Sequence, residues 1–140
     1  MKGIGISGWL RRRIPLDHGS GDRGMATIQM VLLLPAVLAV LFAGMQAALW
    51  YHARAVAIAA AQEGARAAGA QYGTAGAGSA EAAGFLADAG PGVISGTSVH
   101  SSRSATTATV TVSGSSMSVI PGWTITVHQS ATVPVERITG

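Results

Sequence analysis

The side chains of this chain that are best suited to chemistry are its histidines and serines. The histidines number 4, and they are His18, His52, His100 and His128. No pair of them has the spacing of a metal site, and no serine lies in the Gly-x-Ser-x-Gly turn of a hydrolase. The phosphate-binding pattern Gly-x-x-x-x-Gly-Lys is also absent, and the chain contains no cysteine. We therefore predict a non-enzymatic protein that holds no metal and no cofactor.

The sequence contains a candidate site of proteolytic processing after Gly24. Arg23 and Gly24 stand directly before a tract that carries no charged side chain until Arg54. A peptidase acting between Gly24 and Met25 would separate this tract from everything before it. Residues 1–24, which are rich in glycine and arginine, are therefore expected to form a leader on the cytoplasmic side.

The uncharged tract has the length and composition of a membrane-spanning helix. Residues 25–51 would extend roughly 40 Å as an α-helix, whereas the hydrocarbon core of a bilayer is about 30 Å thick. Thr27, Gln29 and Gln46 interrupt its apolar surface, but they do not form one polar face. We predict a transmembrane helix over residues 25–51, with the lipid bilayer as its partner.

The distribution of charge predicts the orientation of this helix. The formal net charge is +3, which taken alone would suggest a nucleic-acid partner. The excess lies before the apolar tract, in Lys2, Arg11, Arg12, Arg13 and Arg23. Basic flanks stay on the cytoplasmic side during insertion. We therefore predict a single-pass protein of the cell membrane, with its N-terminus in the cytoplasm, its C-terminal part on the envelope or extracellular side, and no nucleic-acid partner.

After the span, the sequence predicts a helix, a linker and a β-rich region. The helix is expected to continue outside the membrane through residues 52–72, and residues 73–92 to form a linker and a short helix. Ser79 is the expected N-cap of the short helix, which would cover residues 80–89. From residue 93 to 140 the apolar period changes to two, which is typical of half-buried strands.

The expected strands give the fold class. Apolar and polar side chains alternate in residues 107–113 and 125–133, and a weaker strand is expected around residues 97–101. A single helix lying on the apolar face of such a small antiparallel sheet would complete a minimal α+β domain. Because the core of so short a domain is small, assembly with partners would help its stability.

Several segments of the chain resemble the TadE-like family of pilin-related proteins. They are Arg23-Gly24 with residues 25–29, the long apolar helix with Pro35, the Gln-Glu-Gly-Ala-Arg-Ala-Ala segment at 62–68, and residues 108–116, 119–123 and 134–138. The resemblance implies a pilin-like fold and a minor pilin or pseudopilin of a tight-adherence (Flp-type) pilus or secretion assembly. It also implies processing by a prepilin-type peptidase after Gly24 and contact with pilus assembly membrane proteins.

One position departs from the pilin pattern. Pilins resemble one another in a glutamate five residues after the cleavage glycine, where this chain has Gln29. An amide oxygen accepts a hydrogen bond but does not neutralise a neighbouring subunit's ammonium group, so entry into a filament is left open. Gln29 is alternatively a tolerated polar residue near the membrane edge. Pro35 frees the carbonyl of Val31, either for subunit packing or as a tolerated membrane proline.

Small residues repeat along the helix at four-residue spacing. The rows are Ala39, Ala43 and Ala47 within the predicted span, and Ala57, Ala61, Ala65 and Gly69 beyond it. Such rows permit close helix packing and make self-association a candidate property of the chain.

Other functions stay open on the sequence alone. The main alternative is an uncleaved single-pass protein that tethers an extracellular binding or structural domain to the membrane. A secreted binding module, cut near Ala48 after a small-x-small pattern, and an exported hydrolase are further alternatives. The mature N-terminus distinguishes the first two from a chain processed after Gly24.

Overall fold

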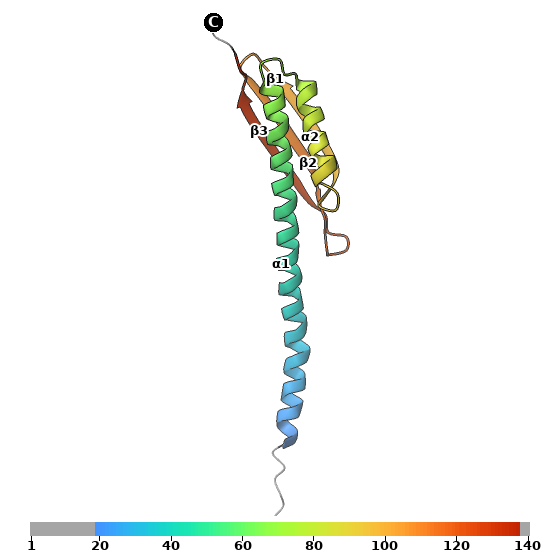
Figure 1. The fold of residues 1–140 in the computed structure, drawn as a ribbon. Helices are drawn as coiled ribbons and strands as arrows, with labels where there is room; N and C mark the ends of the chain where they lie inside the picture. The colour runs from blue at the N-terminus through green and yellow to red at the C-terminus, as the bar shows by residue number, and fades with distance from the viewer. Residues whose placement is uncertain (1–18, 138–140) are drawn as a thin grey trace, which may run out of the picture. The chain divides into compact units, whose positions relative to one another are not determined.

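The computed structural model describes residues 19–137, with side-chain burial from residue 24 onward. Its elements are α1 (Gly19–Gly69), α2 (Ala75–Ala89), β1 (Ile94–Arg103), β2 (Thr107–Ser116) and β3 (Ile125–Pro134) (Figure 1). The predicted α+β class, a long apolar helix followed by a short helix and a small antiparallel sheet, is confirmed. Most of the predicted leader lies outside the described residues, whereas its end, from Gly19, forms the start of α1.

Contacts divide the chain into two units, Met1–Leu38 and Ala39–Gly140. In the first unit the described residues belong to α1 and expose apolar side chains, with Met30 and Leu32 69% and 70% exposed. Within Gly24–Gly69, α1 is long and apolar enough to cross a membrane. Its uncharged part, between Arg23 and Arg54, has an apolar surface that suits a lipid or protein environment better than water.

The second unit contains the sheet, whose strand order is β1-β2-β3 and whose pairs are antiparallel. β2 is central, and its Val112 lies opposite Val99 of β1. The predicted alternation in β2 is confirmed, because Ala108, Val110 and Val112 are fully buried while the residues between them are not. The opposite face of the sheet is polar, and His128 lies exposed there as its strand pattern predicts.

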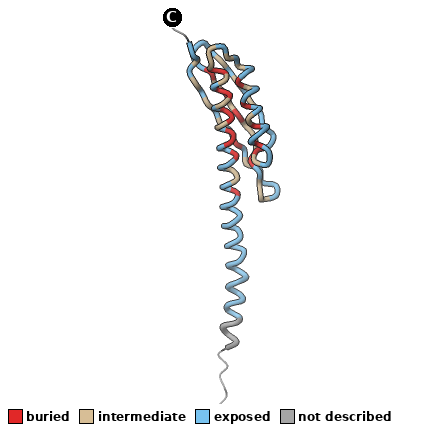
Figure 2. Tube along the Cα trace, viewed as in Figure 1, coloured by how far each residue is buried: buried red, intermediate tan, exposed pale blue. Residues whose placement is uncertain are grey.

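The core lies between the sheet and the alanine-rich half of α1. It joins Ala53, Val56, Ala57, Ala60, Ala61 and Ala65 of α1 with Ala82 and Leu86 of α2 and with Ile94, Val110, Val112 and Val127 of the sheet. Figure 2 shows this buried stripe on one side of α1 and on the strands beside it. The predicted single covering helix is corrected to two, because alanine side chains alone are too small to cover a three-stranded sheet and α2 supplies the larger Leu86.

Glycines allow α1 and α2 to approach each other closely. A Cβ atom on Gly64 would lie 2.5 Å from the carbonyl oxygen of Gly78 and 2.9 Å from the Cβ of Ala82. A Cβ atom on Gly78 would lie 2.7 Å from the Cβ of Ala68. A side chain at either glycine would therefore push the two helices apart.

α1 ends at Gly69, where groups from distant parts of the chain bind its last carbonyl oxygens. Nη1 of Arg103, at the end of β1, donates to the carbonyl oxygen of Ala68 and, at 2.9 Å, to that of Ala70. The backbone N–H of Glu136 donates to the carbonyl oxygen of Gly69 at 2.9 Å. A cation is favourable at this position because the last carbonyls of a helix carry partial negative charge. Arg103 thus joins the sheet to the end of α1.

α2 begins at Ala75, earlier than the predicted start at residue 80. Its N-cap is Thr74, whose Oγ1 accepts a hydrogen bond from a backbone N–H of the first turn at 3.0 Å. The predicted cap, Ser79, was wrong, because its hydroxyl lies inside the helix and donates to carbonyl oxygens of the preceding turn. Helix propensity disfavours the glycines here, but the contact with α1 requires one at Gly78 and overrides that preference.

We expect Gly64→Val to lower the free energy of unfolding by about 1–3 kcal/mol, because the new side chain overpacks the contact between the helices. Gly84→Val is the matched control, since no atom lies within 4 Å of a Cβ on this α2 residue. Thermal unfolding of the full chain in detergent micelles, followed by circular dichroism, measures both. Equal midpoints for the two variants would contradict the close contact.

Candidate functional site

The candidate processing junction is a peptide bond inside a helix. Gly24 and Met25 lie in α1, which begins at Gly19. No neighbouring group lies within 4 Å of a Cβ on Gly24, and Met25 is 68% exposed. The bond is therefore accessible, although a peptidase that binds an extended substrate has to unwind the first turns of α1. Glycine weakens a helix by about 1 kcal/mol relative to alanine, so Gly19, Gly21 and Gly24 lower the cost of unwinding.

The junction is followed by an apolar surface on all sides of α1. The exposed large side chains are Met25, Ile28, Met30, Val31, Leu32, Leu33, Leu34, Val37, Leu38, Val40, Leu41, Phe42 and Met45. No charged residue lies between Arg23 and Arg54. A helix that is apolar all round suits a membrane better than a soluble surface.

Gln29 and Pro35 lie on this apolar part of α1. Both residues are exposed, and the helix continues on either side of Pro35. Because proline has no N–H, the carbonyl of Val31 lacks its usual helical donor. The assembly roles predicted for the two residues stay predictions.

The two rows of small residues differ in their surroundings. Ala57, Ala61 and Ala65 are fully buried against their own chain, and Gly69 contacts the sheet, where its Cβ would lie 2.6 Å from Cγ2 of Val133. The row within the apolar surface, Ala39, Ala43 and Ala47, is exposed. The first row therefore serves the fold of the domain, whereas self-association through the second stays a prediction.

Gln46 is the functional residue that the sequence did not identify. It is 3% exposed and holds the loop between β2 and β3 against α1. Its Oε1 accepts hydrogen bonds from the N–H of Val119 at 3.0 Å and from Oγ of Ser118 at 3.1 Å, and its Nε2 donates to the carbonyl oxygen of Met117 at 3.3 Å. One amide thus satisfies three groups of a distant loop.

In the sequence, Gln46 is one of several polar residues in an apolar tract, and nothing distinguishes it from Gln29. The loop that it binds lies more than 70 positions later, at sequence separations of 71 to 73. The signal that could have suggested the contact is weak: a buried amide needs partners, and Ser118 is one of two polar residues in a mainly apolar loop.

The titratable residues do not form a second site. His52, His100 and His128 are exposed, and His18 lies outside the described residues. Among residues 19–137, no group of three or more histidine or acidic side chains could hold a metal ion. Arg54 instead lies with its guanidinium 5.8 Å from the ring centre of Trp50.

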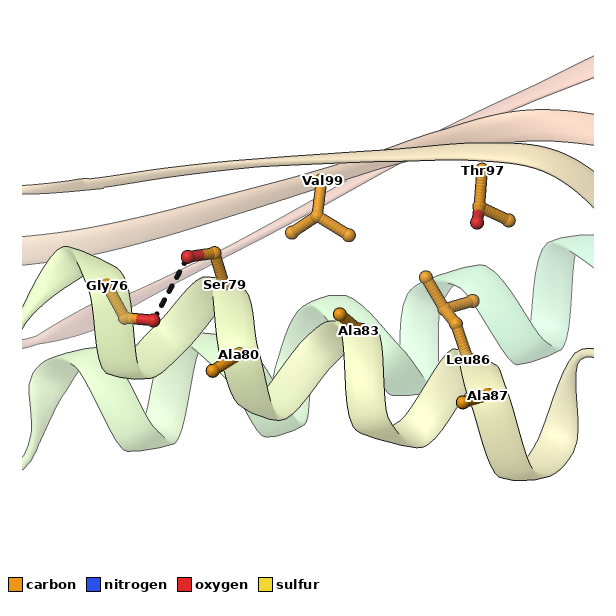
Figure 3. Close-up of a pocket in the computed structure, with 8 residues that line it drawn as sticks. All are labelled: Gly76, Ser79, Ala80, Ala83, Leu86, Ala87, Thr97 and Val99. Carbon is orange, nitrogen blue, oxygen red and sulfur yellow. Dashed lines mark hydrogen bonds between the residues drawn. The ribbon is translucent and has the colours of Figure 1, made fainter.

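A groove of about 540 Å³ lies between α2 and the edge strand β1 (Figure 3). Its lining is uncharged, and Figure 3 shows Ala83 and Leu86 of α2 on the side of the helix that faces Val99 and Thr97 of β1. The hydroxyl of Ser79 is already bonded to the carbonyl oxygen of Gly76, as the dashed line in Figure 3 shows. The groove offers neither an acid nor a base, so it does not have the composition of a catalytic site.

The contact between α1 and α2 explains the small residues in the segment at 62–68. Gly64, Ala65 and Ala68 are buried on the side that faces α2 and the sheet. On the solvent side, Nη1 of Arg66 lies 2.8 Å from Oε1 of Glu63. Such an exposed pair contributes a few tenths of a kcal/mol. The buried glycine and alanines therefore matter more to the fold than the ion pair.

Comparison with known proteins finds one family match, which covers less than half of the chain. Residues 24–66 match the model of the family described as TadE-like protein. No curated protein and no solved structure matches the chain. The match begins at Gly24 and ends at Arg66, so it covers the apolar part of α1 and most of the 62–68 segment. The resemblance inferred from the sequence is confirmed over these residues, and that of the C-terminal segments stays a prediction.

We expect Gln46→Leu to release the β2–β3 loop and to lower the free energy of unfolding by about 1–3 kcal/mol, because Ser118 and Val119 lose a buried partner. Hydrogen–deuterium exchange of the full chain in micelles should accelerate at Val119. Gln62→Leu is the matched control, because Gln62 is an exposed glutamine on the same helix. Unchanged exchange at Val119 in the Gln46 variant would show that the amide does not hold the loop.

Proposed function

Starting from an α1 that matches the TadE-like family of pilus-associated membrane proteins, we propose that this chain is a non-enzymatic minor pilin-like or pseudopilin-like subunit of a tight-adherence pilus or secretion assembly. The chain is anchored by α1 and processed by a prepilin-type peptidase after Gly24. Its N-terminus faces the cytoplasm, and α2 and the sheet lie on the envelope side. Its partners are the lipid bilayer and the membrane proteins that assemble the pilus.

The observation that carries this proposal is the coincidence of three boundaries at Gly24. The family match begins there, the apolar tract of the sequence begins with the next residue, and the last basic residue of the N-terminal segment is the one before. This is the order of a charged leader, a cleavage glycine and a membrane helix.

The structure of the domain argues against cleavage near Ala48. A cut at that point would remove Gln46 and with it the hydrogen bonds to Met117, Ser118 and Val119. The exported part would then keep a loop that has lost the three hydrogen bonds holding it against α1. A membrane-anchored form is therefore favoured over a secreted binding module, and an uncleaved tether is the main alternative.

We expect the mature chain to begin at Met25 when it is expressed with a prepilin-type peptidase, and mass spectrometry of the N-terminus measures this. Gly24→Val should block cleavage, because a side chain prevents the close approach of the peptidase to the backbone. Gly44→Val is the matched control, since neither glycine has a neighbour within 4 Å of a Cβ. A mature chain that retains Lys2 would favour the uncleaved tether, and one that begins near Ala47 would favour the secreted module.

Gln29 gives a second test, which concerns entry into a filament. A carboxylate at this position could neutralise a neighbouring subunit's free amine, whereas the amide of Gln29 does not. We therefore expect Gln29→Glu to increase the share of the chain recovered with sheared filaments, and Gln29→Leu to leave it unchanged. Equal shares for the two variants would mean that no amine of a neighbour faces this position.

A further inference from the structure

The loop between β2 and β3, residues 117–124, exposes two large apolar side chains. Met117 and Trp123 are 50% and 55% exposed. Apart from these two, Tyr72 is the only large apolar residue beyond α1 that is exposed among the described residues. The loop carries no charged residue. It is therefore a small apolar patch on a domain whose remaining outer surface is mainly polar.

A tight turn sets the shape of this loop. The N–H of Trp123 donates to the carbonyl oxygen of Ile120 at 3.2 Å, and Gly122 has a positive φ of 77°. Pro121 at the second position and glycine with positive φ at the third are the signature of a type II turn. Such a turn brings its first and last residues close together, so Ile120 and Trp123 lie side by side at its base.

The loop is also fixed in position against α1. The amide of Gln46 binds it through Met117, Ser118 and Val119. On the other side, the N–H of Met117 donates to the carbonyl oxygen of Val93 at 3.2 Å. The apolar patch is thus held next to the helix turn that contains Gln46.

This helix turn lies where a membrane span that starts at Met25 ends. An α-helix rises about 1.5 Å per residue, so the stretch from Met25 to Gln46 is roughly 32 Å long, close to the thickness of a bilayer's hydrocarbon core. Met45, the residue before Gln46, is exposed and apolar. Trp50 and Tyr51 follow within little more than one turn, and such aromatic residues gather at the membrane surface.

From this juxtaposition we infer that the β2–β3 loop is a second membrane contact, in which Trp123, with the half-buried Ile120 beside it at the base of the turn, inserts into the headgroup region of the envelope-side leaflet. The contact continues the lipid-exposed surface of α1 and holds the domain against the bilayer. The inference rests on the membrane anchoring in the proposed function, but not on processing after Gly24 or on entry into a pilus. A neighbouring protein is the competing occupant of the patch.

Because the chain has no cysteine, single spin labels can test this contact. The full chain is reconstituted into phosphatidylcholine–phosphatidylglycerol vesicles with a nitroxide at Ile120→Cys or, as a control, at Ala105→Cys. Ala105 is exposed in the turn between β1 and β2. The length of β2 places it about 30 Å from the β2–β3 loop. Electron paramagnetic resonance measures collisions of each label with oxygen, which prefers lipid, and with a water-soluble nickel complex on both sides of the vesicle.

The ratio of oxygen to nickel collisions is expected to be several-fold higher at residue 120 than at residue 105. Equal ratios in a chain that resists carbonate extraction would overturn the inference while leaving the anchored subunit intact. A label at 120 that is shielded from both reagents would also overturn it, because the label would then be covered by protein, either its own domain or a second copy of the chain. If carbonate extracts the chain from the vesicles, α1 is not a membrane anchor. That result would overturn both this inference and the proposed function.

A second measurement covers the case in which Ile120→Cys fails to fold. Trp9→Phe together with Trp50→Phe leaves Trp123 as the only tryptophan, since the chain has 3. Brominated lipids should quench its fluorescence more strongly than the water-soluble quencher acrylamide does. The reverse order would place Trp123 in water and overturn the inference.

Discussion

The fold depends on the contact between the alanine-rich face of α1 and the sheet. Alanine and glycine on this face let the helix lie close to β2 and α2, and Gly64 and Gly78 mark the closest approach between the helices. The hydrogen bonds of Arg103 then fix the end of α1 to the end of β1. The same helix also carries the uncharged apolar surface. The domain and the membrane anchor therefore share one element, α1.

Gln46 lies at the boundary between the exposed apolar part of α1 and the part that packs inside the domain. Before it, the helix exposes Phe42 and Met45, whereas after it Ala53 is fully buried. A buried amide in this position is stable because the loop supplies two donors and one acceptor for it. The contact also restricts where the membrane can end, since a loop bound at Gln46 has to remain outside the hydrocarbon core or at its boundary.

Much of the fold could be predicted from local patterns. The alternation in β2 and β3, the turn at Pro121 and Gly122, and the uncharged tract each reflect a periodicity or a composition that the sequence displays directly. The start of α2 could not be predicted in this way, because Gly76 and Gly78 disfavour a helix and the compensating contact of Gly78 with α1 is not visible in the local sequence. For the candidate site, the junction at Gly24 was predicted from the sequence and stays a prediction, whereas the contact of Gln46 depends on a loop distant in the chain.

The sequence by itself determined that this protein has an apolar helix long enough for a membrane, a charged N-terminal segment and a small β-rich region, because these follow from composition and period. The tertiary structure alone decided which small residues pack inside the domain and which stay exposed. It also decided that Gln46 holds the β2–β3 loop at the end of the apolar surface. Such decisions depend on contacts between residues far apart in the chain, and the local pattern around Ala57 or Gln46 does not specify a distant partner.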